Sequence, residues 1–124
     1  MMSFEEFRQE MDAYRKYAIQ EATAIKEMMV VTQMLEKLYG RFDEQERAMA
    51  DRVIGEWALS EDSSVRFDAL ALIDTFHIVG ALPALHSLLI RLGQSTEVGA
   101  RHEAQKVGDI VAGLGADDQM SGAS

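Results

Sequence analysis

The chain has no cysteine and only one proline, Pro83, among its 124 residues. The lack of cysteine excludes disulfides, thiolate metal ligands and thiol nucleophiles, and it fits a reducing compartment. Neither glycine nor proline occurs before Gly40, so no strong helix breaker interrupts the first third of the chain. This opening segment also lacks a continuous apolar stretch. We therefore expect neither a secretory signal nor a membrane span, and we expect a cytoplasmic protein.

Basic residues are also few, with 12 Lys and Arg against 21 Asp and Glu, and the formal net charge is −9. A net-acidic surface repels phosphate backbones, so we expect no direct binding to nucleic acid. Seven acidic residues lie between Asp43 and Asp62. They form either a solvated helix face that keeps the chain soluble or an electrostatic landing site for a basic partner.

Apolar residues recur at three- and four-residue steps from Phe4 to Tyr39, which predicts helix throughout this segment. Ser3 and Glu6 form a capping box at its start, and Gly40 is expected to end it. One unbroken helix would be about 54 Å long at 1.5 Å per residue, too long for a compact body of this size. We expect a split near Ala18–Thr23. The alternative is one long helix that pairs with another chain.

Four further helices are predicted, over about 43–59, 64–78, 82–92 and 96–112. Asp43 and the acidic turn before residue 64 supply N-caps, Pro83 suits a first helical turn, and Gly80 and Gly93 are expected helix ends. Residues 113–124 show no periodicity, and we expect 115–124 to be a disordered tail. With no strand signal, the chain is predicted to be one all-α domain over residues 1–114.

The chain repeats itself at an offset of 35 residues. The stretch "EDSSVRFDALALIDTF" begins at Glu61, and "TEVGARHEAQKVGDIV" begins at Thr96, with residues of the same kind at six positions, among them Asp62 with Glu97 and Asp74 with Asp109. The preceding helices align at the same offset, so the repeating unit is a helical hairpin, over 43–78 and 80–112. Repeats of this length indicate a stacked α-solenoid. In each copy an acid precedes an arginine by four residues, Asp62 with Arg66 and Glu97 with Arg101, and we expect each pair to close an i,i+4 contact.

These hairpins resemble the HEAT-repeat family over about 70 residues, from 43 to 114. The resemblance is carried by "ALPALHSLLIRLG" with "EVGARHEAQKVGDIVAGLG" in one copy and by "DSSVRFDALALIDTF" in the other. It departs from the pattern where Gly99 follows Val98, because the arginine there comes two residues later. The resemblance implies a short right-handed α-solenoid of antiparallel helical hairpins with five or six helices. Residues 4–39 would supply an N-terminal helical cap, as one helix or a helix pair.

No motif in the sequence predicts catalysis or cofactor binding. The three histidines lack ligand spacing for zinc or iron, and His77 is expected to cap carbonyl groups at a helix end. No Gly-x-Ser-x-Gly elbow or phosphate loop occurs. We therefore expect a protein with no enzymatic activity, no metal and no cofactor. The methionines near Val30 are either core or an adaptable binding patch.

Two functions remain as hypotheses. The first is a binding module that presents its second helices and the acidic helix to another protein, which would be basic. Small acidic proteins that resemble the HEAT family occur among bacterial immunity proteins that neutralise basic toxins, so the resemblance implies an immunity-type or antitoxin-type inhibitor, or an adaptor. The second is a structural homo-oligomer, with a homodimer possible, assembled through a seam that includes Phe4, Phe7 and Met11. The predicted partner-binding residues are Glu44, Asp51, Glu56, Arg66, Asp74, His77, Arg101, Glu103 and Asp109.

Overall fold

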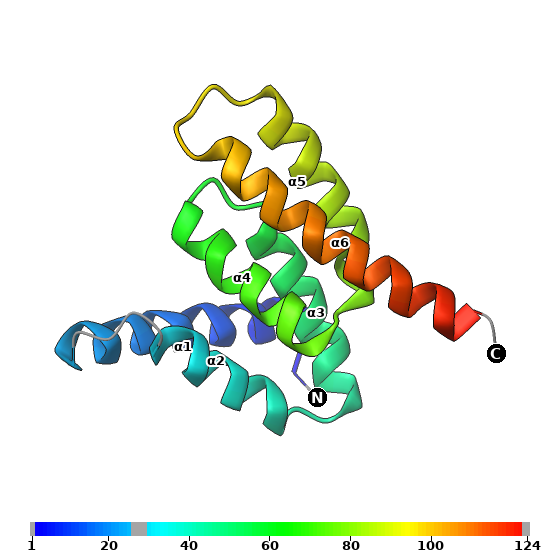
Figure 1. The fold of residues 1–124 in the computed structure, drawn as a ribbon. Coiled ribbons are helices and arrows are strands. Elements are labelled where there is room, and N and C mark those ends of the chain that lie inside the picture. Colours follow the sequence, from blue (N-terminus) through cyan, green and yellow to red (C-terminus); the bar gives the residue numbers. More distant parts are fainter. Residues whose placement is uncertain (1, 26–29, 123–124) are drawn as a thin grey trace. The chain divides into compact units, whose positions relative to one another are not determined.

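The chain is all-α (Figure 1). A computed structural model describes residues 2–25 and 30–122, and these residues contain helices and turns but no strand. They divide into two compact units, an N-terminal unit (Met1–Val53) and a C-terminal unit (Ile54–Ser124), and the third helix runs across the boundary. The predicted single domain over residues 1–114 therefore stays a prediction. The elements are α1 (Phe4–Ile25), α2 (Val30–Arg41), α3 (Glu44–Ala58), α4 (Ser63–Phe76), η1 (Val79–Ala81), α5 (Leu82–Gln94) and α6 (Ala100–Gly122).

The first part of the N-terminal unit forms two helices, α1 and α2, where the apolar periodicity alone would allow one long helix. The expected position of the split was wrong, because Ala18–Thr23 lies inside α1. This stretch contains no glycine or proline, so nothing in it opposes helix. Gly40 does not end the helix either, since α2 continues to Arg41. Met28 and Met29, part of the expected methionine patch, lie outside the described residues.

The core of the N-terminal unit lies where α1 and α2 pack against each other. Phe7, Met11 and Ala18 of α1 are buried, as are Leu35 and Tyr39 of α2. The phenol of Tyr14 donates a hydrogen bond of 3.4 Å to the Met34 carbonyl oxygen and so joins the two helices. The spacing of the α1 residues places them on one face of that helix, which explains why the sequence pattern identified them.

Helix α3 begins with Asp43 as its N-cap, as the sequence predicted, and Glu46 completes a capping box that was not predicted. The Asp43 side chain accepts a hydrogen bond of 2.8 Å from the Glu46 backbone amide, and Glu46 Oε1 accepts one of 2.9 Å from the Asp43 amide. Two amides that the helix itself leaves without partners are thereby satisfied. The α3 N-terminus is fixed by residues only three positions apart, which is why sequence alone was sufficient to place it.

The C-terminal unit is built on an α5–α6 hairpin that contacts α4 through α6 (Figure 1). Gly55, near the end of α3, lies close to α5, since a Cβ there would be 3.9 Å from the Ala84 Cβ. Leu88 is fully buried, whereas Leu89 is only partly buried. The largest fully buried side chains of this unit are Ile54, Leu70, Leu72, Ile73, Leu85, Leu88 and Val107.

Three helix ends in the C-terminal unit differ from those predicted. Helix α4 ends at Phe76, before Ile78 and Gly80, because His77 adopts a left-handed conformation (φ 52°) and its amide bonds to the Ile73 carbonyl. Helix α6 begins at Ala100 and not at Thr96, since Gly99 has φ 89°, which lies outside the right-handed helical region. Helix α6 then continues to Gly122, through the segment expected to be a disordered tail.

We predict that Leu72→Ala lowers the free energy of unfolding by about 2–5 kcal/mol, because Leu72 is 1% exposed and its truncation leaves a cavity. Chemical denaturation monitored by circular dichroism measures the change. Ile90→Ala is the matched control, since Ile90 is 66% exposed and should lose less than about 1 kcal/mol. Equal losses in the two variants would contradict the assigned core.

Candidate functional site

The turn between α3 and α4 is held by hydrogen bonds from its own side chains. The Asp62 carboxylate accepts hydrogen bonds from the Ser64 amide (2.9 Å) and the Ser64 hydroxyl (2.8 Å), so Asp62 is the N-cap of α4. The Ser60 hydroxyl accepts a hydrogen bond of 3.1 Å from the Asp62 amide. The cluster of Ser and Asp in this turn therefore reflects local satisfaction of backbone amides that α4 leaves without partners.

Arg66, in the first turn of α4, joins this turn to α6. Its guanidinium donates two hydrogen bonds to the Glu103 carboxylate, from Nε at 2.7 Å and from the NH2 group at 3.0 Å. Its NH1 group donates to the carbonyl oxygens of Ser60 (2.9 Å) and Glu61 (3.1 Å). The planar guanidinium suits such a two-point contact with a carboxylate. This arrangement replaces the expected i,i+4 contact with Asp62, whose carboxylate caps the helix.

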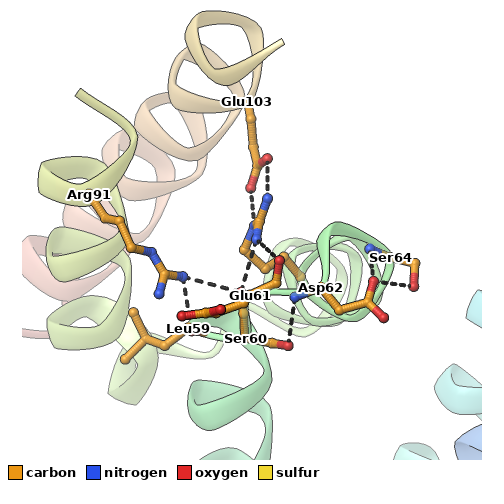
Figure 2. Close-up of polar contacts among 8 residues, drawn as sticks. Leu59, Ser60, Glu61, Asp62, Ser64, Arg91 and Glu103 are labelled. Atoms are coloured by element: carbon orange, nitrogen blue, oxygen red, sulfur yellow. Dashed lines mark hydrogen bonds and ion pairs between the residues drawn. The ribbon is translucent and has the colours of Figure 1, made fainter. Parts of the chain in front are cut away.

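Arg91 of α5 reaches the same turn from another direction (Figure 2). Its guanidinium donates hydrogen bonds of 2.9 Å to the Leu59 carbonyl and 3.2 Å to the Ser60 carbonyl. These carbonyls belong to the two residues that follow α3. Two arginines from different helices thus bond to the backbone of the turn after α3, and neither contact is visible as a short sequence motif.

The buried position of Arg66 determines how the charges of this region are distributed. The hydrogen bonds to Glu103 raise the pKa of Arg66 above its usual value, burial opposes this rise, and the charges of Glu103, Glu97 and Asp62 add to it. Arg66 is 8% exposed, so its charge is paired with Glu103 inside the protein and not presented at the surface. The carboxylates of Glu61, Asp62 and Glu97 lie on exposed residues at the turns before α4 and α6. We call these three residues the acidic turn cluster.

The charge of the C-terminal unit is strongly unbalanced. It contains ten acidic and four basic residues, whereas the N-terminal unit contains eleven and eight. Of the four bases, Arg66 bonds to Glu103, Arg91 bonds to backbone carbonyls, and Lys106 lies 4.6 Å from the centre of the Phe67 ring. The fourth, Arg101, is exposed. Arg91 and Lys106 are also exposed, so Arg66 is the one buried positive charge of this unit.

The face formed by α4 and α6, predicted as the binding surface, has mixed charge. The exposed members of the predicted set on these helices are Asp74, Arg101 and Asp109, with His77 directly after α4. Phe67 is 45% exposed and is partly covered by the Lys106 ammonium group, which stabilises an exposed ring by a cation–π contact. The structure does not bring the predicted residues into one acidic surface here.

In the N-terminal unit, Asp51 has a structural partner that the sequence did not reveal. The Tyr39 hydroxyl donates a hydrogen bond of 2.7 Å to Asp51 Oδ1, and the Arg47 guanidinium lies 5.3 Å from the centre of the Tyr39 ring. Burial raises the pKa of Asp51, while the Tyr39 bond and the Arg47 charge lower it. Burial, the bond to Asp51 and the charge of Asp51 raise the pKa of Tyr39 well above its usual range.

The predicted partner-binding residues therefore divide into two kinds. Asp51, Arg66 and Glu103 form internal hydrogen bonds and are partly or fully buried. Two further residues with internal hydrogen bonds were not predicted: Tyr39, which bonds to Asp51, and Arg91, which bonds to the Ser60 carbonyl. In each case the partner lies at least 12 positions away in the sequence. The exposed members of the predicted set are Glu44, Glu56, Asp74, His77, Arg101 and Asp109.

Neither a metal site nor a membrane span is found in the part of the chain that the structure describes. Within it, no three His, Asp or Glu residues gather in a way that could hold a metal ion. No helix in the same residues combines the length and hydrophobicity that crossing a membrane requires. Comparison of the chain with protein-family models, with curated proteins and with solved structures gave no match.

We predict that Arg66→Met lowers the free energy of unfolding by about 2–4 kcal/mol, because Glu103 and the Glu61 carbonyl lose the donor that Arg66 supplies, and the Ser60 carbonyl keeps only Arg91. Arg101→Met, on an exposed residue, should cost less than about 1 kcal/mol. A double-mutant cycle with Glu103→Gln should give a coupling energy of about 1–3 kcal/mol. Urea denaturation provides all three values, and a negligible coupling energy would contradict the Arg66–Glu103 contact.

We predict that Tyr39→Phe is more destabilising at pH 7 than near pH 4. The Tyr39 hydrogen bond favours ionised Asp51, so its loss raises the folded-state pKa of Asp51 further above the unfolded value. The resulting cost is absent below the unfolded pKa and grows as pH rises through the folded pKa. At pH 7 the loss should be about 1–2 kcal/mol by denaturation. Tyr17→Phe, on a 51% exposed ring, is the control, and parallel pH profiles for the two variants would exclude this role for Asp51.

Proposed function

We propose that the chain is a non-catalytic protein-binding module that binds a basic partner protein through the acidic turn cluster of its C-terminal unit. The observation that carries the proposal is the internal use of positive charge around an exposed set of carboxylates. Arg66 is buried against Glu103, while Glu61, Asp62 and Glu97 stay at the surface. A surface of this kind attracts a positively charged protein and speeds its encounter with the chain.

The proposed role is that of an immunity-type or antitoxin-type inhibitor, or of an adaptor. The proposed architecture is a short HEAT-like α-solenoid, in which turns of successive hairpins line one end. The α5–α6 hairpin, the packing of α4 on α6 and the Arg66–Glu103 contact between them support this architecture. A module of stacked hairpins presents a rigid surface without requiring catalytic groups.

The alternative function is self-assembly through the N-terminal seam. Phe7, Met11 and Ala18, which would form that seam, are 5%, 3% and 0% exposed within the single chain. A coiled-coil partner needs these side chains accessible, since they would be its knobs. The burial of these three residues favours the binding module over assembly through this face.

The proposal predicts that a double charge reversal in the acidic turn cluster slows binding of the partner. A tagged chain first captures its partner from an extract of the organism that encodes it, and mass spectrometry identifies the captured protein. Glu61→Lys with Glu97→Lys should then lower the association rate constant about fivefold or more in low salt, and the difference should shrink at physiological ionic strength. Asp62 is left unchanged because it caps α4.

The matched control is Asp74→Lys with Asp109→Lys, which makes the same change in net charge on the α4–α6 face. Stopped-flow mixing measures association, and thermal midpoints check that all variants fold. A larger effect of the control would move the binding surface to the second helices. Equal effects would show only a response to net charge, and a dimeric wild-type chain in light scattering would favour the self-assembly alternative.

A further inference from the structure

A groove in the N-terminal unit carries an inference about the kind of segment that the partner presents. One face of α1, the end of α2 and the first two turns of α3 enclose about 370 Å³. This volume falls within the range of pockets that bind ligands or side chains. Its apolar lining includes Phe7, Met11, Leu38, Phe42 and Met49. We call this site the α1–α3 groove.

The floor of the α1–α3 groove is firmly packed. Phe7 and Met11 are 5% and 3% exposed, and the Phe7 and Phe42 rings lie 5.2 Å apart between centres. Leu38, Phe42 and Met49 are only partly buried, so they present apolar surface to the groove. Met2, Met11 and Met49 give the lining flexible, polarizable side chains, which adapt to apolar side chains of different shapes.

The rim of the groove is acidic. Among the described residues that line it, Glu10, Asp43 and Glu46 carry carboxylates and none carries a positive charge. The reciprocal capping bonds hold Asp43 and Glu46 in place, and each bond uses only one oxygen of the carboxylate. Glu10 is exposed on α1. The arrangement fits an apolar side chain flanked by lysine or arginine.

The secondary structure of the ligand follows from the walls of the groove. These walls are helices, whose backbone groups are bonded internally, and no strand edge is present among the described residues. An extended peptide would find no ladder partner there, whereas a helix satisfies its own backbone groups. A helix also presents apolar and basic side chains on adjacent faces.

We infer that the α1–α3 groove binds a basic amphipathic helix of a partner protein. The apolar face of that helix enters the groove, and its lysine or arginine residues meet Glu10, Asp43 and Glu46. This inference deepens the proposed function and rests on it for the view that the ligand is a basic protein. It adds a contact site in the N-terminal unit, separate in sequence from the acidic turn cluster.

The test uses the full chain and a fluorescein-labelled peptide with two copies of the sequence KLLKLLK. Fluorescence anisotropy should give a dissociation constant on the order of 10 μM. A peptide with serine in place of leucine keeps the charge and should bind at least about tenfold more weakly, because it cannot fill the apolar floor. Equal binding of the two peptides would reduce the interaction to charge alone and overturn the inference.

Two variants and a control locate the binding site. Glu10→Lys should weaken binding about threefold or more, while Glu21→Lys makes the same charge change at an exposed position of α1 outside the lining. Met49→Gln should weaken binding about fivefold or more, since it places an amide in the apolar lining. Circular dichroism and thermal midpoints confirm that each variant folds. Equal effects of the two glutamate reversals would overturn the inference.

Methionine methyl NMR gives a readout independent of affinity. Peptide should shift the methyl signals of Met2, Met11 and Met49, which line the groove, and leave the Met34 signal nearly unchanged. The reverse pattern would overturn the inference. Sedimentation that showed a dimer dissociated by Met49→Gln would assign the groove to a second copy of the chain, and would also overturn it.

Failure of the groove and failure of the proposed function are distinguishable. If the peptide does not bind in the groove while the captured partner still responds to the Glu61 and Glu97 reversals, the groove inference alone is wrong. If the peptide binds as expected while those reversals leave association unchanged, the acidic turn cluster is not the partner site.

Discussion

The arrangement of the C-terminal unit depends on the contacts of the Arg66 guanidinium. It bonds simultaneously to a carboxylate on α6 and to the two backbone carbonyls of Ser60 and Glu61, which follow α3. A buried positive charge must be matched by acceptors, because its removal from water is costly. Glu103 therefore has to lie opposite Arg66. This requirement fixes the rotation and the register of α6 relative to α4. Apolar packing alone would allow more than one rotation and register.

The start of α6 departs from the offset at which the two sequence copies align. The sequences of the two hairpins align at an offset of 35, which pairs Arg66 with Arg101, yet α4 and α6 begin 37 residues apart, at Ser63 and Ala100. The left-handed conformation of Gly99 delays the start of α6. Glu103 then comes in the first turn of α6, as Arg66 does in α4, and the two bond across the helices. The second hairpin thus supplies the acceptor that the first hairpin requires.

Sequence predicted those features that depend on neighbouring residues. The N-cap role of Asp43 and the apolar face of α1 each follow from residues a few positions apart, and both are confirmed. The errors arose where the deciding group was distant or the local signal was ambiguous. Asp51 was predicted to bind a partner protein at the surface. Its internal hydrogen bond was missed because the donor, Tyr39, lies on another helix. A glycine at position 40 suggested a helix end, but α2 continues through it, whereas α4 ends at a histidine. The extension of α6 through Gly113 and Gly115 to Gly122 has no comparable signal in the sequence.

The distribution of charge gives the two proposed contacts different physical roles. In the C-terminal unit, burial of Arg66 against Glu103 removes one of the four positive charges from the surface, where the carboxylates of Glu61, Asp62 and Glu97 remain. Charges of this kind act on encounter, over about 8 Å at physiological ionic strength, and contribute little to the lifetime of a complex. The α1–α3 groove can lengthen the lifetime of the complex, because its partly buried lining loses contact with water when an apolar side chain of the partner enters. An acidic rim alone would accept any basic protein, and an apolar floor alone would accept any exposed apolar side chain. Selectivity for a basic amphipathic helix follows from the requirement that both be satisfied together.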